Sequence, residues 1–497
     1  MEQPIETFIV KLPLITETWQ EHIINKRFEY CREIYNAYRS KIIRILHYHQ
    51  NTNEWKSFNT LTNFSERNKL MGQYINEHDL PLTEYGLTNQ CKVFAYKYKK
   101  YGINSTITEF VLKNLWSSVN KYLYGKGKKI AYKEKDTFNS YRVRKKGGFN
   151  GMKLDLSKST LSININGKKG KNEKTLDLKF FINPKSAYET EAFSPSNELR
   201  EIGIQREFIR GKWKYYVSFT IQGSKPNKGR QLGEGNVGID LGPSTIAVSS
   251  SNKVYIDELA KDVETIEKEI AVIQQKMDRS RRQTNPLQFN EDGQIRRYPK
   301  GERPEWVKSN HYIKLQNKLK ELYRRRSVKL KLSHINLANE IISYGDNFTI
   351  EKNPISSWAL RAKETKYNSN GRCKKKKRFG KSIGNHAPSM FGVILENKIN
   401  SLGGKITKMD IKHGASQFDF TNQTKTKHEL NERRITLSNG KTHLRDLIAA
   451  FNIQHFQDNE YNVELMKTNY DNFCKFEQNE IERHQNSGKK LVKSFGI

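Results

Sequence analysis

The chain has 497 residues, of which 35% are apolar and 28% charged, a composition typical of a globular protein with roughly two to four domains. Its 88 lysine and arginine residues against 53 acidic ones leave a formal charge of +35. Such an excess repels itself unless a polyanion neutralises it, and the usual polyanion is nucleic acid. The four cysteines form no C-x-x-C pair, which argues against a zinc ribbon and against a disulfide framework.

Neither a membrane span nor a secretory signal is predicted. No uninterrupted apolar run approaches the roughly 18 residues of a membrane-spanning helix. The opening MEQPIETFIV is acidic and lacks the apolar core of a signal peptide. We therefore expect a protein of the reducing cytoplasm with no membrane partner.

The N-terminal half is predicted to be a β-barrel into which helices are inserted. Residues 1–15 contain a strand, because IETFIVKLPL alternates apolar and polar positions. Residues 16–124 carry apolar side chains at helical spacing and are expected to form a helical insert. Alternating segments in residues 125–223, such as KTLDLKFFI and KWKYYVSFTIQG, are expected to complete the barrel.

A basic stretch with interleaved aromatic residues opens the second part of this barrel. Basic side chains that follow a backbone while aromatic rings stack on bases are typical of contact with RNA or single strands. A solvated hairpin would show the same residues, so both interpretations stay open here. The candidate nucleic-acid contacts are Lys126, Lys128, Lys129, Tyr132, Tyr141, Arg142 and Arg144.

The C-terminal half begins after a linker and has a mixed α/β pattern. SKPNKGRQLGEGN, residues 224–236, has the glycine, proline and polar content of a linker. VGIDLGPSTIAVSS and NKVYID are expected to form a hairpin or meander, and KDVETIEKEIAVIQQKMDRSRR a helix with one apolar face. A loop over residues 283–305 leads into a long helical segment, and DNFTIEKN returns as a strand.

Three carboxylates lie where elements of this half meet polar loops. Asp240 ends a buried strand just before Gly242 and Pro243, Glu351 ends the strand FTI, and Asp446 lies on the first turn of a helix in THLRDLIAAFNI. Each acid alone has an ordinary alternative role: a turn, an ion pair with a lysine, or a helix cap. Together, in a chain of +35, they are predicted to converge on two magnesium ions about 3.5 to 4 Å apart that hydrolyse a phosphodiester.

The same segments resemble a known family. VGIDLGPSTIAV, FTIEKN and HLRDLIAAFNI resemble the first, second and third motifs of the RuvC nuclease domain in the transposon-encoded TnpB proteins and their CRISPR descendants. DRSRRQTNPLQFNEDGQIRR, RRRSVKLKLSHINLANEII and RFGKSIGNHAPSMFGVILENKINSLGGKI are similar to the stretches between those motifs in miniature type V-F CRISPR effectors. GKKIAYKEKDTFNSYRV and GKWKYYVSFTIQG resemble that family's wedge domain, so the resemblance covers nearly the whole chain.

This resemblance implies a multidomain α+β protein with a catalytic, magnesium-binding triad of Asp240, Glu351 and Asp446. A β-barrel wedge domain with an inserted helical recognition domain would precede an RNase H-like α/β RuvC domain that carries a small zinc-less insert. The implied divisions are the wedge (1–15 and 125–223), the recognition domain (16–124), the linker (224–236), the RuvC domain (237–412 and 444–497) and a target-nucleic-acid-binding insert (413–443).

The resemblance further implies an RNA-guided DNA endonuclease of bacterial antiviral defence. A guide RNA would pair with target double-stranded DNA next to a short flanking motif, and a single two-magnesium site would cut the unwound strands in turn. Type V-F effectors work as homodimers on one guide RNA and TnpB acts alone, so the resemblance favours a homodimer. The alternatives are a TnpB nuclease of transposon origin, an RNA-guided DNA-binding repressor with little or no cleavage, and a structure-specific nuclease without a guide.

The chain departs from the family's pattern near the third motif. Most members carry a four-cysteine zinc ribbon there, whereas SQFDFTN and LSNG stand where the two C-x-x-C pairs would be, so no zinc is expected. Phe418, Phe420 and Leu430 are expected to supply a small apolar core instead. The family often has an aspartate two residues before the catalytic one, where this chain has Leu444.

Two further basic clusters are predicted to border the nucleic-acid path. One lies on the long helical segment and the other in the loop GRCKKKKRFGKS, for which a solvent-facing loop is the alternative. Contacts from such residues to phosphates would be sequence-independent and salt-sensitive. The residues are Arg324, Arg325, Arg326, Lys374, Lys375 and Arg378.

Overall fold

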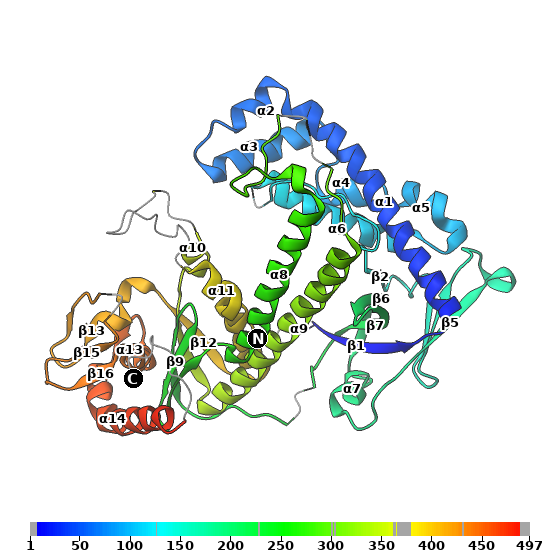
Figure 1. The fold of residues 1–497 in the computed structure, drawn as a ribbon. Helices are drawn as coiled ribbons and strands as arrows, with labels where there is room; N and C mark the ends of the chain where they lie inside the picture. Colours follow the sequence, from blue (N-terminus) through cyan, green and yellow to red (C-terminus); the bar gives the residue numbers. More distant parts are fainter. Residues whose placement is uncertain are drawn as a thin grey trace. The chain divides into compact units, whose positions relative to one another are not determined.

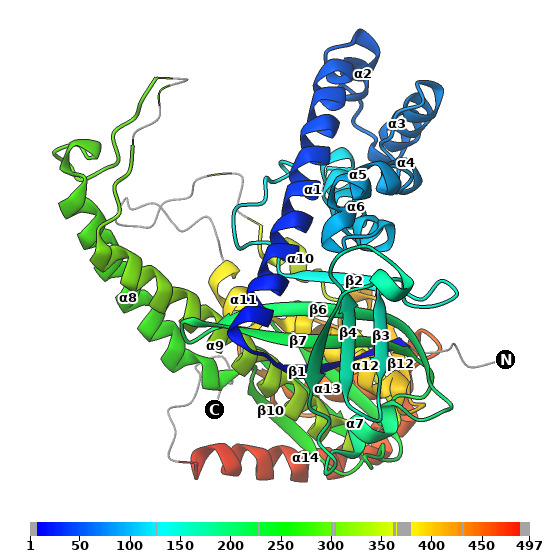
Figure 2. The same cartoon turned by 90° about the vertical axis from the view of Figure 1, so that its right-hand side faces the viewer.

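The structure is a computed structural model, and it forms two compact units, Met1–Lys228 and Gly229–Ile497, which we describe separately (Figures 1 and 2). Both combine helices with a β-sheet, so the chain is a mixed α/β protein. The described residues are 7–125, 127–226, 229–299, 302, 305–360, 364, 379–429 and 432–487. Of the residues singled out above, Lys126, Lys374, Lys375, Arg378 and Leu430 lie outside them.

The first unit is built on a seven-stranded antiparallel sheet in the order β2-β6-β7-β1-β5-β4-β3. Strands β2 and β3 stand at the two ends of this order, and within the described residues no strand pairing joins them. The predicted barrel is therefore an open sheet with two edges. The strands are β1 (Thr7–Ile15), β2 (Ser140–Arg144), β3 (Met152–Asp155), β4 (Thr160–Asn164), β5 (Thr175–Phe180), β6 (Glu198–Ile209) and β7 (Lys212–Gln222).

Helices fill the sequence between β1 and β2, where apolar residues recur at helical spacing. Strand β1 alternates strictly between buried and exposed residues, and the long helix that follows it buries one face against the same core. The helices and 3-10 turns of the unit are α1 (Thr18–Gln50), α2 (Asn53–Phe58), α3 (Phe64–Glu77), α4 (Glu84–Thr88), α5 (Cys91–Tyr98), η1 (Lys99–Tyr101), α6 (Ser105–Leu123), η2 (Gly170–Asn172) and α7 (Ala187–Ala192).

A buried arginine ties these helices to the sheet. Arg27 of α1 donates from Nε to the Tyr141 hydroxyl at 3.1 Å. Its Nη1 donates to the carbonyls of Tyr101 (2.8 Å) and Asn164 (3.0 Å), and its Nη2 to that of Gly102 (3.1 Å). A buried guanidinium is tolerated only when its donors are satisfied, so Arg27 fixes α1 against β2, β4 and η1.

The second unit is built on a five-stranded mixed sheet in the order β10-β9-β8-β11-β12. Strands β8, β9 and β10 form an antiparallel meander, whereas β11 and β12 run parallel to β8. Parallel neighbours need a crossover connection. The long helices α8 (Glu264–Thr284) and α9 (Asn310–Ile341) lie in the connection that leads to β11, and α12 (Pro388–Ser401) lies in the one that leads to β12. The strands are β8 (Asn236–Leu241), β9 (Thr245–Ser250), β10 (Val254–Glu258), β11 (Asn347–Glu351) and β12 (Lys405–Met409).

Helices cover both faces of this sheet. On one face, Val237, Ile239, Phe348 and Ile350 share a core with α9 and α12, and on the other β9 and β10 share a core with α13 and α14. The helices are α8 (Glu264–Thr284), α9 (Asn310–Ile341), α10 (Ile355–Trp358), α11 (Gly380–His386), α12 (Pro388–Ser401), α13 (Arg445–Gln454) and α14 (Val463–Gln485). No helix in the described ranges is both long and apolar enough to cross a bilayer.

Smaller elements complete the second unit. Three two-stranded pairs surround α13, and they are β13 (Phe418–Asp419) with β14 (Thr424–Lys425), β15 (Arg434–Thr436) with β16 (Thr442–Leu444), and β17 (Phe456–Gln457) with β18 (Glu460–Tyr461). The 3-10 turns are η3 (Lys261–Val263), η4 (Pro286–Gln288), η5 (Ile342–Tyr344), η6 (Ile411–His413) and η7 (Ala415–Gln417).

Helix α13 lies unusually close to strand β8 at Gly238. A Cβ atom added to Gly238 would lie 2.1 Å from the carbonyl oxygen of Ala450 and 2.2 Å from the backbone nitrogen of Gln454. Any side chain at this position would therefore push the helix away from the sheet.

We expect Gly238→Ala to lower the free energy of unfolding by about 1–3 kcal/mol, because the new methyl group collides with backbone atoms that cannot move independently. Urea denaturation of the purified chain measures the change. Gly392→Ala is the matched control, since nothing lies within 4 Å of a Cβ at Gly392 in α12. That variant should be neutral or more stable by about 0.5–1 kcal/mol. Equal effects of the two substitutions would contradict the close contact.

Candidate active site

Two acidic residues lie at the carboxyl ends of neighbouring parallel strands, Asp240 as the last residue but one of β8 and Glu351 as the last residue of β11. Ile239 of β8 lies opposite Ile350 of β11, and the next residues along these strands are Asp240 and Glu351. Side chains alternate between the two faces of a strand, and the isoleucines belong to the core under α9 and α12. Asp240 and Glu351 therefore lie on the opposite face of the sheet, the face that α13 covers.

The third acid, Asp446, comes from the first turn of α13. Ala450, one helical turn further on, is the residue whose carbonyl lies against Gly238. The close approach of α13 to β8 thus carries Asp446 toward the strand ends where Asp240 and Glu351 lie. The structure brings together the three acids that the sequence singled out.

The pKa of Asp240 reflects its proximity to the other two acids. Burial raises the pKa of Asp240 well above its usual value, and the carboxylates of Asp446 and Glu351 raise it further, whereas the Arg445 guanidinium opposes them. Burial also raises the pKa of Glu351, and a hydrogen bond from Asn353 partly offsets that effect. The site is short of positive charge, which is the setting in which a bound cation is most favourable.

Within the described residues, the hydrogen bonds seen from a cationic side chain to a triad carboxylate come from Arg445. Its Nη2 and Nε lie 3.1 and 3.3 Å from Oδ1 of Asp446, and its Nη1 donates to the Glu432 carbonyl at 3.0 Å. The side chains of Arg445 and Asp446 are 14% and 16% exposed. One oxygen of Asp446 is therefore engaged by its neighbour in the chain.

The donor set fits magnesium by chemistry, since Mg²⁺ prefers hard carboxylate oxygens. Within the described ranges, however, no group of three or more His, Cys, Asp or Glu side chains is placed closely enough to hold a metal ion. The carboxylates are thus gathered at one end of the sheet, but their side chains do not have the positions of a loaded site.

Of the comparisons with known proteins, the one with solved structures finds similar chains. No family model and no curated protein matches the chain. The cryo-EM structure of a Cas12f1–sgRNA–target DNA complex aligns over 90% of this chain and 99% of its own, at 13% identity and a TM-score of 0.47. A CRISPR-Cas12f ternary complex aligns over 90% and 98% at 14% identity and a TM-score of 0.25. An AacC2c1–sgRNA–non-target DNA complex aligns over 81% and 62% at 9% identity and a TM-score of 0.29.

The predicted nucleic-acid contacts of the first unit lie in different settings. Lys128 and Lys129 are exposed, and Tyr132 is 57% exposed. Tyr141 is instead fully buried and its hydroxyl accepts from Arg27, so the ring belongs to the core and cannot stack on a base in this conformation. The alternating pattern that suggested a stacking surface placed Tyr141 on the inner face of β2.

Four of the other arginines of these clusters, Arg142, Arg144, Arg324 and Arg326, make ion pairs. Arg142 and Arg144 both pair with Glu201, at 3.5 and 3.1 Å. On α9, Arg324 pairs with Glu321 at 2.7 Å. Arg326 pairs with Glu267 of α8 and also donates to Asn385 of α11, whereas Arg325 is exposed. Arg326 therefore holds helices together, and Arg325 is the member of the cluster most open to a phosphate.

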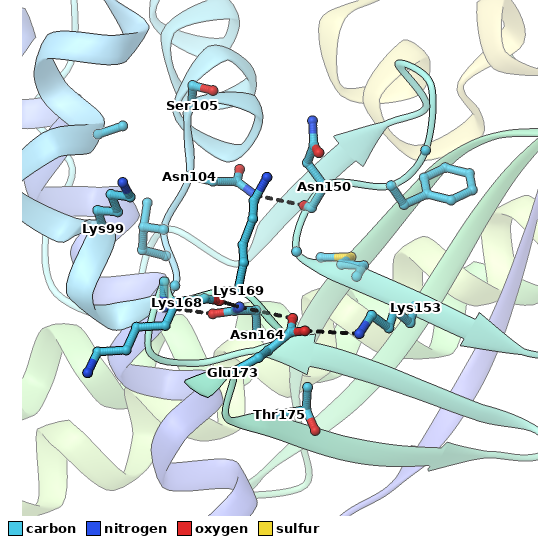
Figure 3. A pocket seen from close by; sticks show the side chains of 18 of the residues that line it. Lys99, Asn104, Ser105, Asn150, Lys153, Asn164, Lys168, Lys169, Glu173 and Thr175 are labelled. Carbon is cyan, nitrogen blue, oxygen red and sulfur yellow. Dashed lines mark hydrogen bonds and ion pairs between the residues drawn. The ribbon is translucent and has the colours of Figure 1, made fainter. Parts of the chain in front are cut away.

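A cavity of about 900 Å³ in the first unit is lined by lysines that the sequence analysis did not single out (Figure 3). It lies between α5 and α6 on one side and the β3–β5 strands with their loops on the other. Glu173 accepts from Lys153 (2.9 Å) and Asn164 (3.0 Å) at its edge. The lysines are Lys92, Lys99, Lys153, Lys168 and Lys169, which come from three separate segments.

Hydrogen bonds join residues 416–422 and 437–440, the two segments at which the resemblance would place cysteine pairs. Asp419 Oδ1 accepts from the Thr421 backbone N–H at 2.9 Å and from its hydroxyl at 2.6 Å. Its Oδ2 accepts from the Ser438 backbone N–H at 2.7 Å and from its hydroxyl at 2.8 Å. SQFDFTN and LSNG are therefore linked through one carboxylate, a contact that the sequence analysis missed.

Apolar packing supports this link. Phe418 and Phe420 are buried, as the sequence predicted, and they join Ile435 and Leu437 in a core shared with α13 and α14. The Phe418 ring stacks on Tyr461 with 4.1 Å between centroids. The apolar residues between 413 and 443 thus pack in a core that also contains residues of α13 and α14.

We expect Asp240→Asn to raise the melting temperature of the chain by about 2 °C or more at neutral pH in a chelator, since it removes a buried acid whose ionised form is disfavoured by burial and by two other carboxylates. Because the folded-state pKa of Asp240 is raised, its ionised form lowers stability above that pKa, and this effect fades as the pH falls through it. The difference between variant and wild type should therefore shrink on acidification.

Magnesium provides the second arm of the same thermal-unfolding experiment. Added Mg²⁺ should raise the melting temperature of the wild type more than that of Asp240→Asn. Asp262→Asn, which changes an exposed acid of the same unit, should behave as the wild type in both arms. A lower melting temperature for Asp240→Asn, or an equal response to Mg²⁺, would contradict the crowded-carboxylate description.

We expect Asp419→Ala to lower the free energy of unfolding by about 1–3 kcal/mol, because it leaves the donors of Thr421 and Ser438 without their acceptor. Burial alone would raise the pKa of Asp419, but hydrogen bonds from these two residues outweigh it and lower the pKa. The stabilisation is therefore present above the unfolded-state pKa of about 4 and is lost as the pH falls through the folded value.

Chemical denaturation from pH 7 to pH 3 checks this expectation. Asp471→Ala is the control. Asp471 is exposed and forms a surface ion pair with Lys441 at 3.7 Å, and such pairs contribute little to the free energy of unfolding. A zinc chelator should leave the wild-type melting temperature unchanged. A large loss of stability on chelation would mean that a metal holds the insert.

Proposed function

We propose that the protein is an RNA-guided, magnesium-dependent DNA endonuclease with a RuvC-like active site formed by Asp240, Glu351 and Asp446. The observation that carries the proposal is the convergence of the three motif acids at one end of the mixed sheet. Two of them raise the pKa of the third there. Structural sites rarely gather like charges in this way, whereas sites that bind divalent cations do.

The architecture of the second unit supports an RNase H-like fold. An antiparallel meander of three strands continues into two strands parallel to the first, with helices on both faces. We assign the RuvC domain to residues 237–412 and 444–497, the insert to 413–443, and the linker to 224–236. In the first unit we assign the recognition helices to 16–124 and the wedge sheet to 1–15 and 125–223.

The residues of the site have distinct tasks in this proposal. Asp240 and Glu351 are fixed by the hydrogen-bonded strands that they end, and Asp446 is carried by a helix that a glycine contact holds in place. Magnesium ions, when bound to these acids, would activate a water molecule for attack and stabilise the leaving 3′ oxygen. Arg445 holds Asp446 by one oxygen and so limits its rotation.

The charge of the chain supports nucleic-acid partners. A formal charge of +35 and a lysine-lined cavity in the first unit suit the backbones of a guide RNA and of target DNA. A single site would cut the two unwound strands in turn, and we propose a homodimer on one guide RNA. All three acids are present, which disfavours a repressor that binds without cutting.

Cleavage of a plasmid that carries the matching target beside randomised flanks tests the proposal. The protein purified with its co-expressed RNA should cut in Mg²⁺, and Asp240→Ala should lower the rate by roughly 100-fold or more, whereas Asp262→Ala should not. Specific binding without cutting in Mg²⁺ or Mn²⁺ would favour the repressor. Cutting that persists after removal of the RNA would favour an unguided nuclease.

A further inference from the structure

Helix α13, which carries Asp446, begins without a cap of its own. Its N-cap residue is Leu444, which has no side-chain acceptor for the first free N–H groups of the helix. The third helical residue is Leu447, so the reciprocal Glu or Gln bond of a capping box to the N-cap N–H is also missing. The N–H of Arg445 donates to the Arg433 carbonyl at 2.9 Å, whereas the N–H of Leu444 needs an acceptor from elsewhere in the chain.

A buried glutamate of α14 takes that place. Oε1 of Glu477 accepts the backbone N–H of Leu444 at 2.7 Å, the same N–H that a capping-box glutamate would bind. Glu477 is 5% exposed, and hydrogen bonds that involve a buried charged group are among the strongest in proteins. The cap is thus supplied from a residue 33 positions further along the chain.

A histidine and a tyrosine brace this glutamate. Oε2 of Glu477 accepts from Nδ1 of His443 at 2.5 Å, and Nε2 of His443 lies 2.6 Å from the Tyr470 hydroxyl. His443 precedes Leu444 in β16, and Tyr470 lies on α14 two turns before Glu477. Both oxygens of the carboxylate are therefore bound to adjacent residues of β16, which leaves the junction of β16 and α13 little freedom.

We propose that Glu477, braced by His443 and Tyr470, is a positioning residue for Asp446. Asp446 follows the capped residue Leu444 by two positions, so the bond to Glu477 fixes where along the sheet the first turn of α13 lies. The contact with Gly238 fixes how deep the helix lies. Glu477 acts through the backbone and touches no reacting group, and this inference rests on the proposed nuclease function.

The same helix offers a matched control. Glu480, one turn after Glu477, is 4% exposed, and its Oε1 accepts the backbone N–H of Ile256 at 2.8 Å. Ile256 belongs to edge strand β10 and is not part of β16 or α13. Glu477 and Glu480 are thus equally buried and hold different backbone segments, and Glu480 also forms an ion pair with Arg483 at 2.6 Å.

Amide hydrogen exchange on the full chain with its RNA tests the cap without any need for activity. In Glu477→Ala, the backbone amides of residues 444–448 should exchange about tenfold faster, whereas Glu480→Ala should leave them unchanged and loosen residues 254–258 instead. Glu477→Gln keeps an acceptor of the same size and should restore most of the protection. If Glu477→Ala does not fold, Glu477→Gln takes its place in the comparison with the Glu480 variant. Equal protection of residues 444–448 in the Glu477 and Glu480 variants would overturn the inference.

Cleavage kinetics then test the consequence for Asp446. Glu477→Ala should lower kcat by about 10- to 100-fold, with KM for target DNA unchanged and a higher Mg²⁺ concentration at half-maximal rate. Glu480→Ala should keep kcat within about threefold even where its melting temperature falls as far, and Glu477→Gln should recover most of the rate. An equal fall in kcat for both alanine variants would overturn the positioning role. Failure of the wild type to cut would instead count against the proposed function, and the exchange result would still decide the cap.

Discussion

The second unit depends on one close contact between backbones, that of α13 with β8 at Gly238. A glycine in a strand loses more conformational freedom on folding than any other residue, at a cost of about 0.5–1 kcal/mol relative to alanine. In return, α13 buries Leu447, Ala450 and Phe451 in the core that it shares with β9, β10 and α14. The same contact determines that an acid on the first turn of the helix meets the acids at the strand ends.

The two units bury charge in opposite ways. In the first, Arg27 is surrounded by four oxygen acceptors, so its burial contributes to a single, well-defined packing of helices on the sheet. In the second, the carboxylates of Asp446 and Glu351 lie near Asp240, and the Arg445 guanidinium is hydrogen-bonded to Asp446. The first arrangement is complete without any further group, whereas the second leaves negative charge unbalanced. The first charge is therefore satisfied by the fold itself, whereas the second is one that the proposed cation site would satisfy.

Much of this could be predicted from local pattern. The alternation in β1, the spacing in α1 and the three motif acids depend on residues close in sequence, and hydrophobic periodicity reports such features directly. The direction in which a polar strand faces cannot be read in this way: the basic and aromatic pattern predicts Tyr141 on a binding surface, whereas the residue lies in the core. Closure of the predicted barrel is likewise a property of strand pairing at a distance.

Contacts between distant segments could not be predicted at all. Asp419 and Ser438 are 19 residues apart, and Leu444 and Glu477 are 33 apart. Nothing local marks these residues, although the polar D-F-T and L-S-N-G segments do indicate turns. The close approach at Gly238 is hidden for the same reason, since a glycine in a strand signals a bulge as readily as a crossing helix. The lysines of the cavity in the first unit also come together only through the fold.

The position of α14 in the chain has a consequence for biosynthesis. This helix holds both the edge of the sheet, through Glu480, and the start of α13, through Glu477, yet it is synthesised after all three acids. At about 5–20 residues per second, a ribosome needs roughly two to eight seconds to go from Asp446 to the end of α14, and the helix then has still to leave the exit tunnel. During that interval the acids exist without the groups that align them. A nascent chain would therefore lack the aligned arrangement of the proposed cleavage centre until α14 has left the exit tunnel.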